Sequence, residues 1–419
     1  MAPGSFPRAL RRGLFPLLSI VAATALQAAD WPGWRGIHRD GIAGDPLPSA
    51  LPSQPAPRWR MPLGHGYASP VVARGKLVVL EESGGRETAR ALDPATGKEL
   101  WRTAYAEAWS DEFEPGPRCT PLVDRGLVFV QSAQGEFACL SLDDGHRIWG
   151  FRFADLGMVW ISERHSNIGA AVRRGHTGSP AIAGDRVIVQ VGSNRGAAIV
   201  AFDRLTGRQL WKSLDDATSY SSPVVARIAG REQFVTATCE GLVGLDTADG
   251  ALLWRVPFRT GANRNVLTPV IDGDSVAFAS HTTGLRHVTV RADGARQAVA
   301  EDWYNRNLPI NLSTPVKWDG HYYGLGAARD FVCVNAADGK VAWSEPGFGA
   351  VAQTIGGAGR LIVQLDTGEV RLLRATPAKY EELGRFQACG KTYSLPAWSD
   401  GVLYVRDPMG CAAYVLGTK

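Results

Sequence analysis

The stretch Ala91-Leu-Asp-Pro-Ala-Thr-Gly-Lys-Glu-Leu-Trp101 recurs in recognisable form along the chain, and its recurrence decides the fold. Each copy has glycine at the seventh position and tryptophan at the eleventh. The other copies run from Cys139 to Trp149, from Ala201 to Trp211, from Gly244 to Trp254 and from Cys333 to Trp343. A period of roughly 45 residues is typical of a repeat architecture, in which each unit is one supersecondary element.

A second motif alternates with the first: serine or threonine followed by proline, ahead of short apolar residues. Its clear copies are Ser69-Pro70, Thr120-Pro121, Ser179-Pro180, Ser222-Pro223, Thr268-Pro269 and Thr314-Pro315, with weaker ones at Thr354-Ile355 and Leu395-Pro396. Proline has no amide to donate to a sheet, so it suits the first residue of a strand. The motif therefore predicts eight units, each beginning with a strand.

One unit, from Ser69 to Trp101, contains four short apolar runs separated by turn residues. Arg74-Gly75 predicts a tight turn after the first run, and the polar turn from Asp93 to Gly97 precedes the last. We expect the Asp93 carboxylate to accept backbone amides of its turn, and Gly97 to supply a positive φ. Four antiparallel strands repeated radially describe a β-propeller blade, so we predict an all-β, eight-bladed propeller. A seven-bladed ring is the competing count.

The recurring tryptophans are predicted to fill the spaces between neighbouring blades, because an indole buries a large apolar area. The predicted docking residues are Trp59, Trp101, Trp149, Trp211, Trp254 and Trp343. The fifth unit keeps Ala292-Asp293-Gly294 but has no tryptophan at the expected place. The eighth unit runs from Pro396 to Leu416 and lacks one strand. We expect the segment around Trp59 to supply that strand and so close the ring, which removes an open sheet edge.

The first residues have the pattern of an export signal: three arginines, the apolar run Leu14–Leu26 and then small residues. The predicted organisation is a signal peptide at 1–29, an extended N-terminal segment at 30–56 and a single propeller at 57–419. We expect a periplasmic or extracellular protein that is not lipid-anchored through an N-terminal cysteine. No other segment is apolar and long enough to predict a transmembrane helix.

Charge gives little guidance to a partner. Removal of the predicted signal takes away three arginines and no acid, which lowers the formal net charge from +4 to +1. Such a nearly neutral chain offers no electrostatic case for binding nucleic acid. We expect a monomer whose partner is an envelope protein or a small polar ligand.

The chain has six cysteines, and export raises the possibility of disulfides. Cys119 with Cys139, or Cys389 with Cys411, would pair within one blade. Their strands, however, are predicted to lie two ladder spacings apart, roughly 9–10 Å, which is beyond disulfide reach. We therefore expect mostly free, buried thiols.

Residues three or four positions before each Ser/Thr-Pro motif should approach the central axis on one face of the ring. This set forms the candidate ligand-binding funnel: Tyr67, Arg118, His176, Tyr220, Asn265, Asn311 and Tyr393, with Gln353 in the irregular seventh unit. The loop from Trp109 to Glu114 would add carboxylates to the same face. These polar and aromatic residues indicate either a pocket for a small polar ligand or peptide, or side chains that solvate a channel mouth. No pattern of His, Cys or acidic residues predicts a metal site.

The repeat Ala-x-Asp-x-x-Thr-Gly-x-x-Leu-Trp resembles the tryptophan-docking repeat of the pyrroloquinoline quinone (PQQ) superfamily of β-propellers. That superfamily includes quinoprotein alcohol dehydrogenases and BamB-like outer-membrane assembly factors. The resemblance covers about residues 57–419. The segment Trp31-Pro32-Gly33-Trp34-Arg35-Gly36 is also similar to the start of exported PQQ-like repeat proteins.

For a dehydrogenase, the resemblance implies PQQ in a funnel with a tryptophan floor, a ceiling of two adjacent disulfide-linked cysteines, a Ca²⁺ site with Glu and Asn ligands, and an Asp base. No two cysteines are adjacent in this chain, and no Cys-x-x-Cys-His haem motif is present. No catalytic or metal-binding residue is therefore assigned.

These observations favour an exported, non-catalytic propeller that serves as a binding and assembly scaffold in the cell envelope and needs no cofactor. The alternative is a divergent PQQ-dependent dehydrogenase that uses PQQ with Ca²⁺ to oxidise alcohols or sugars. A third hypothesis is a propeller that binds a glycan or a peptide through Tyr67 and Tyr220.

Overall fold

The computed structural model describes Met1 and residues 30–111, 115–158, 174–193, 195–260, 265–294 and 296–417. The predicted export signal at residues 1–29 lies outside these ranges, apart from Met1. Residues 112–114 of the loop that was expected to add carboxylates also lie outside them.

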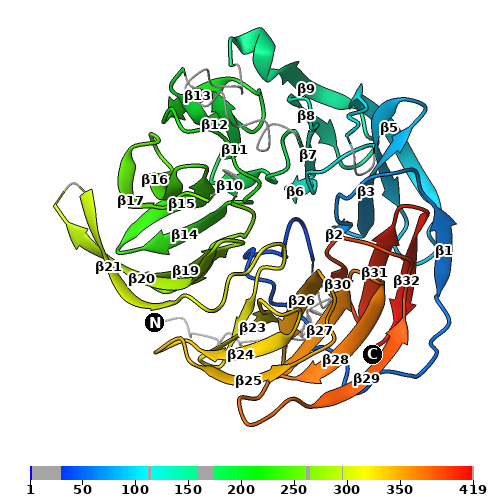
Figure 1. The fold of residues 1–419 in the computed structure, drawn as a ribbon. Coiled ribbons are helices and arrows are strands. Elements are labelled where there is room, and N and C mark those ends of the chain that lie inside the picture. The colour runs from blue at the N-terminus through cyan, green and yellow to red at the C-terminus, as the bar shows by residue number, and fades with distance from the viewer. Residues whose placement is uncertain are drawn as a thin grey trace.

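Eight four-stranded antiparallel sheets stand around a central axis like the blades of a propeller, as Figure 1 shows. Blades one to four consist of β2 (Val71–Ala73), β3 (Lys76–Ser83), β4 (Arg86–Leu92) and β5 (Glu99–Glu107); β6 (Leu122–Asp124), β7 (Leu127–Gln131), β8 (Glu136–Ser141) and β9 (Arg147–Arg152); β10 (Ala181–Ala183), β11 (Arg186–Ser193), β12 (Ala197–Asp203) and β13 (Gln209–Ser213); β14 (Val224–Ile228), β15 (Arg231–Thr238), β16 (Gly241–Asp246) and β17 (Leu252–Pro257). Blades five to eight consist of β18 (Val270–Asp272), β19 (Ser275–Ser280), β20 (Thr283–Asp293) and β21 (Arg296–Asn305); β22 (Val316–Trp318), β23 (His321–Leu325), β24 (Phe331–Asn335) and β25 (Val341–Glu345); β26 (Ala352–Gly357), β27 (Arg360–Leu365), β28 (Glu369–Arg374) and β29 (Glu382–Gln387); β30 (Ala397–Ser399), β31 (Val402–Asp407), β32 (Gly410–Val415) and β1 (Trp59–Pro62). The predicted eight-bladed propeller is confirmed, and the seven-bladed count is wrong.

Helical structure is nearly absent from the described part of the chain. A 3-10 helix, η1 (Phe153–Leu156), follows β9. Within the described ranges, no helix has the length and apolar character that crossing a membrane requires.

The turns of blade one follow from the residues that form them. Arg74 and Gly75 have φ values of 50° and 72°, the left-handed pair that a two-residue hairpin needs. The Asp93 carboxylate accepts the amides of Ala95 and Thr96 at 2.8 and 2.9 Å, and Gly97 has a φ of 71°. The predicted roles of Asp93 and Gly97 are therefore confirmed.

The recurring spacing of glycine and tryptophan along the chain reflects a contact between neighbouring blades rather than a contact within one blade. The Trp101 indole of blade one lies against Gly145 of blade two, where an added Cβ would stand 2.5 Å from the ring. Its Nε1 donates to the Leu142 carbonyl at 2.8 Å, also in blade two. Each glycine of the repeat thus leaves room for the tryptophan of the preceding blade.

The same arrangement recurs around the ring. Six tryptophan Nε1 atoms each donate to a backbone carbonyl of the following blade at 2.8–3.1 Å: Trp59 to Pro94, Trp101 to Leu142, Trp149 to Arg204, Trp211 to Thr247, Trp303 to Ala336 and Trp343 to Thr376. Because Trp59 belongs to the last blade and Pro94 to the first, the same contact also spans the point where the ring closes.

Blade five corrects one expectation and blade four shows a departure. Blade five does have its tryptophan, Trp303, which pairs with His287 in the ladder and lies against Gly339. The longer β20–β21 hairpin separates this tryptophan from its turn, which hid it from the repeat pattern. Trp254 of blade four is buried, but its Nε1 donates to the Gln233 side chain of its own blade at 2.6 Å.

The hydroxyl groups of the Ser/Thr-Pro motifs form a chain of hydrogen bonds around the axis. The Ser69 amide donates to Thr120 Oγ1, the Thr120 amide to Ser179 Oγ, and the Ser179 amide to Ser222 Oγ, each at 3.1 Å. The Thr268 amide donates to Thr314 Oγ1 at the same distance. Each hydroxyl therefore satisfies a buried amide of a neighbouring blade, which explains why serine or threonine precedes the proline.

Replacing Thr120 by valine is expected to lower the free energy of unfolding by about 2 kcal/mol, because the buried Ser69 amide loses its acceptor. Thr120→Ser keeps the hydroxyl and serves as the matched control. Urea unfolding of the two variants measures the difference. Equal stability of Thr120→Val and Thr120→Ser would show that the hydroxyl contributes nothing to blade association.

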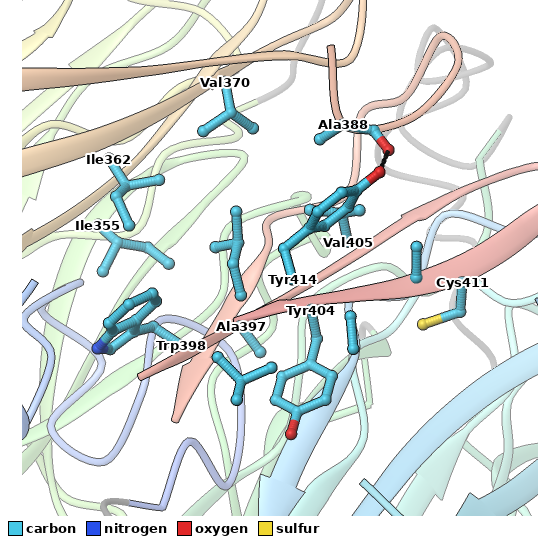
Figure 2. Close-up of a cluster of buried hydrophobic side chains, with 14 of the residues drawn as sticks. Ile355, Ile362, Val370, Ala388, Ala397, Trp398, Tyr404, Val405, Cys411 and Tyr414 are labelled. Atoms are coloured by element: carbon cyan, nitrogen blue, oxygen red, sulfur yellow. Dashed lines mark hydrogen bonds between the residues drawn. The ribbon is translucent and has the colours of Figure 1, made fainter. Parts of the chain in front are cut away.

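The ring closes as predicted, through an early strand that completes the last blade. Strand β1 pairs antiparallel with β32, with Trp59 opposite Ala413 and Pro62 opposite Gly410. Figure 2 shows part of the core around blade eight, where Trp398 lies near Ile355 and Ile362 of blade seven. Tyr404 belongs to the same buried cluster but faces blade one, and its ring contacts Trp59.

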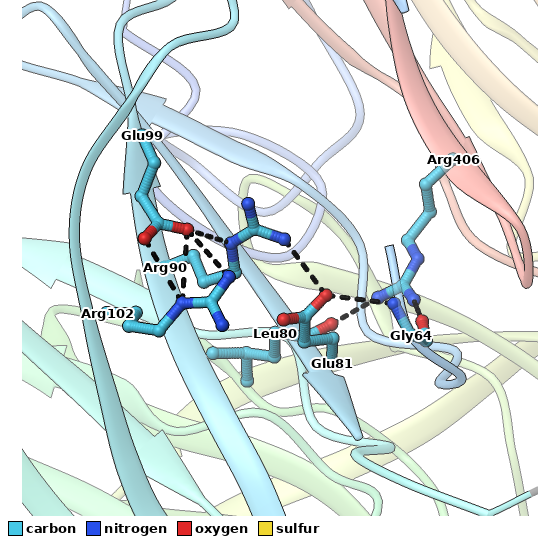
Figure 3. A network of polar contacts seen from close by, with 7 residues as sticks. All are labelled: Gly64, Leu80, Glu81, Arg90, Glu99, Arg102 and Arg406. Atoms are coloured by element: carbon cyan, nitrogen blue, oxygen red, sulfur yellow. Dashed lines mark hydrogen bonds and ion pairs between the residues drawn. The ribbon is translucent and has the colours of Figure 1, made fainter. Parts of the chain in front are cut away.

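The seam between blade eight and blade one contains a fully buried arginine. Arg406 donates to the carbonyls of Ala68 at 3.2 Å, Gly64 at 3.1 Å and Leu80, all next to or in blade one. Figure 3 shows this guanidinium beside the carboxylate of Glu81, which pairs with Arg90 at 3.1 Å. One side chain of the last blade therefore bonds one carbonyl in blade one and two in the segment that leads into it.

The segment after residue 30 enters the centre of the ring, where the dark blue chain is visible in Figure 1. We call residues 31–43 the axial plug. One isolated β-bridge joins Trp31 of the plug to Val72 of blade one, and another joins Ile42 of the plug to Gly356 of blade seven. Part of the predicted N-terminal segment therefore lies at the axis of the propeller, where its residues form turns and bends.

Two buried arginines fasten the axial plug to blades on different sides of the ring. Arg35 donates to the carbonyls of Thr314 and Pro315 at 2.9 Å, and Arg39 to the Pro180 carbonyl at 2.6 Å. Burial lowers the pKa of Arg35 to about 10 and that of Arg39 to about 9. At neutral pH both remain charged, and backbone carbonyls supply their hydrogen-bond acceptors.

All six cysteines lie among the described residues, and all are buried and free. The expectation of buried thiols is confirmed.

Candidate functional site

The candidate funnel residues surround one cavity at the end of the axis where the chain enters the innermost strands. The cavity has a volume of about 440 Å³. Six of the eight predicted residues line it: Tyr67, Arg118, Tyr220, Asn311, Gln353 and Tyr393. We call this cavity the axial mouth. Its volume is within the range of roughly 300–1,000 Å³ that is typical of pockets for small ligands.

Tyrosines provide the aromatic walls of the axial mouth. Tyr67 precedes blade one and Tyr393 precedes blade eight, and their ring centroids are 5.6 Å apart. The Gln353 amide donates to the Tyr393 carbonyl at 3.2 Å, which fixes the loop that carries this tyrosine. Tyr220 precedes blade four, which lies across the axis from blade eight in an eight-bladed ring. Aromatic faces therefore stand at opposite ends of one diameter.

Arginines extend this surface and are held by a carboxylate. The Arg118 guanidinium lies over the Tyr67 ring, 5.1 Å from its centroid. Arg118 pairs with Asp111 at 2.9 Å, and Arg174 pairs with the other oxygen of the same carboxylate at 3.3 Å. Asp111 thus supports two largely buried guanidinium groups beside the mouth, while the residues that the structure describes in the lining include no carboxylate.

His176 and Asn265 are not part of the lining, although the sequence predicted them there. Both are 1% exposed. The His176 ring packs against Phe153 with centroids 5.3 Å apart, and the Asn265 amide donates to the Thr238 carbonyl at 2.6 Å. The two side chains are therefore packed inside the protein and do not face the cavity.

Burial shifts the pKa values of His176 and Glu87 in opposite directions. It lowers the pKa of His176 to about 4 and raises that of Glu87, which accepts the Tyr105 hydroxyl at 2.8 Å, to about 7. Between about pH 4 and 6.5, the native state binds fewer protons at His176 than the unfolded chain does. Between about pH 4.5 and 7, it binds more protons at Glu87. The contribution of His176 to the free energy of unfolding therefore rises as the pH increases from about 4 to 6.5. The contribution of Glu87 falls as the pH increases from about 4.5 to 7.

Replacing Glu87 by glutamine is expected to raise stability relative to the unmodified protein by up to about 3 kcal/mol above pH 7, because only the glutamate must ionise in a buried site. The gain should grow between about pH 4.5 and 7 and be small below that window. Thermal or urea unfolding across pH measures it. The exposed Glu107→Gln is the control, and a gain that does not change with pH would contradict the assignment.

The structure adds lining residues that the repeat did not reveal. Trp34 of the axial plug lines the inner end of the mouth, and its Nε1 donates to Thr268 Oγ1 at 2.8 Å. Thr177 also lines the mouth. The only sequence signal for Trp34 was its position in a Gly-flanked tryptophan motif outside the repeats. That motif did not show where the segment lies, because its partners are on distant blades.

A second cavity of about 510 Å³ lies beyond the plug. It is lined by Ile37 and Arg39 of the plug and by residues of inner strands such as Val123 and Ile182. Since neighbouring residues of the plug line both cavities, the plug separates the two ends of the axis. The axial mouth is therefore closed at its inner end.

The lining does not fit PQQ held with Ca²⁺. Calcium prefers carboxylate and carbonyl oxygens in sets of six to eight. The described lining offers the amides of Asn311 and Gln353 but no carboxylate, and the described residues contain no cluster of three His, Cys, Asp or Glu side chains. Trp34 supplies an indole at the inner end, but this residue alone does not make a quinone site.

Comparisons with known proteins identify relatives of this chain. A family model described as outer membrane protein assembly factor BamB matches residues 52–173 and 159–345. The outer membrane protein assembly factor BamB of Burkholderia pseudomallei (strain K96243) is 25% identical over 232 residues, which cover 53% of this chain and 54% of that protein. The chain thus matches about half the length of this curated relative.

Solved structures share the fold. BamB from Moraxella catarrhalis superposes with a TM-score of 0.58 at 17% identity, over 86% of this chain and 97% of that one. A quinohemoprotein alcohol dehydrogenase from Pseudomonas putida HK5 gives 0.51 at 12% identity, over 93% and 81% of the two chains. Identities this low support the architecture and nothing more specific. From its repeats, its closed ring of eight blades and the extent of the family match, this chain belongs to the PQQ-like β-propeller family described as outer membrane protein assembly factor BamB.

Proposed function

We propose that this protein is an exported, non-catalytic propeller that acts as a binding and assembly scaffold in the cell envelope, with the axial mouth as its recognition site. The observation that carries the proposal is the convergence of Tyr67, Tyr220, Tyr393 and Asn311 from separate blades on one cavity with a closed inner end. The tyrosine rings can pack against a ligand, and the Asn311 amide can form hydrogen bonds with it. The matching family description, an outer-membrane assembly factor, supports a partner in the envelope.

The scaffold is suited to recognition because its rigid parts position the mouth. The side chains of the mouth lie directly before inner strands, and hydroxyl bonds between blades hold the starts of these strands. Binding residues on short loops above a rigid sheet need little reordering when a ligand binds. The full-length protein is expected to bind as a monomer with one mouth per chain.

Site-specific photocrosslinking tests the recognition role. A benzoylphenylalanine in place of Leu312, which lines the mouth and is 38% exposed, should crosslink a defined envelope component in membrane fractions. The same group at Ile148, 40% exposed on the outer strand β9, is the matched control. Tyr220→Ala should reduce the Leu312 crosslink and leave the Ile148 pattern unchanged. Identical products from both positions would contradict the mouth as the recognition site.

The dehydrogenase alternative makes a distinct prediction. Purified protein mixed with PQQ and Ca²⁺ would retain quinone absorbance after desalting and would reduce a dye with alcohols or sugars. For a non-catalytic scaffold we expect no retained absorbance and no dye reduction. Retention together with turnover would overturn the non-catalytic assignment.

A further inference from the structure

We infer that the axial mouth binds a short neutral saccharide. This inference rests on the proposed recognition role of the mouth and adds the chemical class of its ligand. It follows from three features: the distribution of aromatic and polar groups, the hydrogen-bonding atoms that remain unpaired, and the closed inner end.

Around the mouth, polar side chains lie in the sectors between the aromatic side chains. Tyr393 and Tyr220 belong to blades eight and four, which face each other across the axis. Asn311 precedes blade six and Thr177 precedes blade three, so the polar groups lie between the aromatic ones around the ring. A pyranose ring has apolar C–H faces and hydroxyls that radiate from its edge. Aromatic rings cover such faces, while amides and hydroxyls bond the edge.

Two buried polar atoms of the lining have no hydrogen-bond partner in the protein. They are the side-chain oxygen Oδ1 of Asn311 and the hydroxyl Oγ1 of Thr177. Buried polar atoms are normally paired, and an unpaired one costs free energy. The Asn311 oxygen is an acceptor and needs an O–H or N–H from a ligand; the Thr177 hydroxyl can both donate and accept. Both atoms are shielded from solvent, so they meet a ligand once their side chains turn toward the cavity, where sugar hydroxyls can satisfy them.

The charges of Arg118 and Arg174 are partly neutralised within the protein, which reduces the advantage of an anionic ligand over a neutral one. The guanidinium groups of Arg118 and Arg174 are both held by Asp111, and Arg118 also lies over Tyr67. A carboxylate-rich ligand would have to compete with Asp111 for these groups, and it would bring no donor to Asn311. The stacked Arg118–Tyr67 pair instead widens the flat wall that a sugar face can cover.

The closed inner end favours a compact ligand over an extended peptide. A peptide strand that adds to a sheet requires a free strand edge and a groove that lets the chain pass. Here the axial plug pairs with inner strands at Val72 and Gly356, and Trp34 closes the inner end of the mouth. A saccharide of one to a few rings enters such a blind pocket from its open side.

Titration calorimetry of the full chain tests the inference with three named probes: cellotetraose, maltotetraose and N,N′,N″,N‴-tetraacetylchitotetraose. At least one is expected to bind with a stoichiometry of one and a Kd below about 1 mM. Tyr220→Ala and Tyr67→Ala should each weaken binding at least about tenfold, since each removes a stacking face. Asn311→Leu should also weaken binding, because it removes the acceptor for a hydroxyl of the ligand. Tyr304→Ala, on β21 outside the mouth, should leave Kd unchanged.

The folding of each variant is checked by its near-ultraviolet circular dichroism and unfolding midpoint. If Tyr220→Ala does not fold, Tyr220→Leu replaces it, since leucine fills the space without an aromatic face. Absence of binding by all three saccharides at 10 mM, roughly tenfold above the expected Kd limit, would overturn the inference. So would binding that survives both tyrosine substitutions.

A tyrosine-containing tetrapeptide serves as a parallel probe that separates the two proposals. Binding of this peptide but of no saccharide would overturn the saccharide inference while preserving the recognition role of the mouth. Saccharide binding accompanied by retained PQQ and dye reduction would support the ligand class and overturn the non-catalytic scaffold. The two proposals therefore fail through different measurements.

Discussion

Replacing Trp101 by alanine is expected to lower the free energy of unfolding by about 4 kcal/mol, the range typical of a buried tryptophan truncated to alanine. The indole is 8% exposed, fills the space between blades one and two, and donates to the Leu142 carbonyl. Its loss leaves both a cavity and an unpaired carbonyl. Equilibrium urea unfolding measures the change, and Trp101→Phe, which keeps a ring but loses the donor, should cost considerably less.

A double-mutant cycle with Gly145 isolates the contact itself. Gly145→Ala should destabilise the unmodified protein because its Cβ would stand 2.5 Å from the Trp101 ring and because φ is +74°. In the Trp101→Ala background the clash with the indole disappears, while the approach to Thr103 Oγ1 at 2.8 Å and a backbone cost of about 1–2 kcal/mol remain, so Gly145→Ala should cost less there. If Gly145→Ala costs the same in both backgrounds, the indole does not account for the glycine of the repeat.

Replacing Arg406 by methionine is expected to destabilise the ring by about 4 kcal/mol, because the carbonyls of Ala68, Leu80 and Gly64 lose their shared donor in a buried seam. Methionine keeps much of the volume of the arginine stem, so the loss reports mainly on hydrogen bonding. Arg102→Met is the control, since Arg102 is 52% exposed and surface ion pairs contribute little.

Hydrogen exchange locates the effect of Arg406→Met. Faster exchange is expected in blade one near Leu80 and in strand β1, because both belong to blades that meet at this seam. A loss spread evenly over all blades would instead indicate a general destabilisation and contradict a specific role at ring closure. Unchanged stability would show that the three carbonyls find other donors.

The repeat allowed much of the fold to be predicted because its chemistry is local. Asp93 and Gly97 act within one turn, and Arg74-Gly75 within one hairpin, so their roles can be read from spacing alone. The closing strand at Trp59 could be predicted because one blade lacked a strand and one tryptophan lacked a repeat. Trp303 was missed because its hairpin is longer and the fixed spacing no longer holds.

The candidate site was only partly predictable for a related reason. Positions before each Ser/Thr-Pro motif identified the end of the axis, and six of those residues do line the mouth. The repeat could not tell that His176 and Asn265 are packed inside the protein, since side-chain direction depends on tertiary contacts. Trp34 was beyond reach because it enters the mouth from a segment outside the repeats.

The sequence by itself determined the strands of a blade and the closing of the ring, and it favoured eight blades over seven, since these features depend on periodic turns and on a regularly spaced indole. Only the tertiary structure decided what occupies the axis. Arg35 and Trp34 of the plug bond to Thr314 and Thr268, which are more than two hundred residues away in the chain. Such contacts leave no periodic trace, because they join one unrepeated segment to many repeated ones.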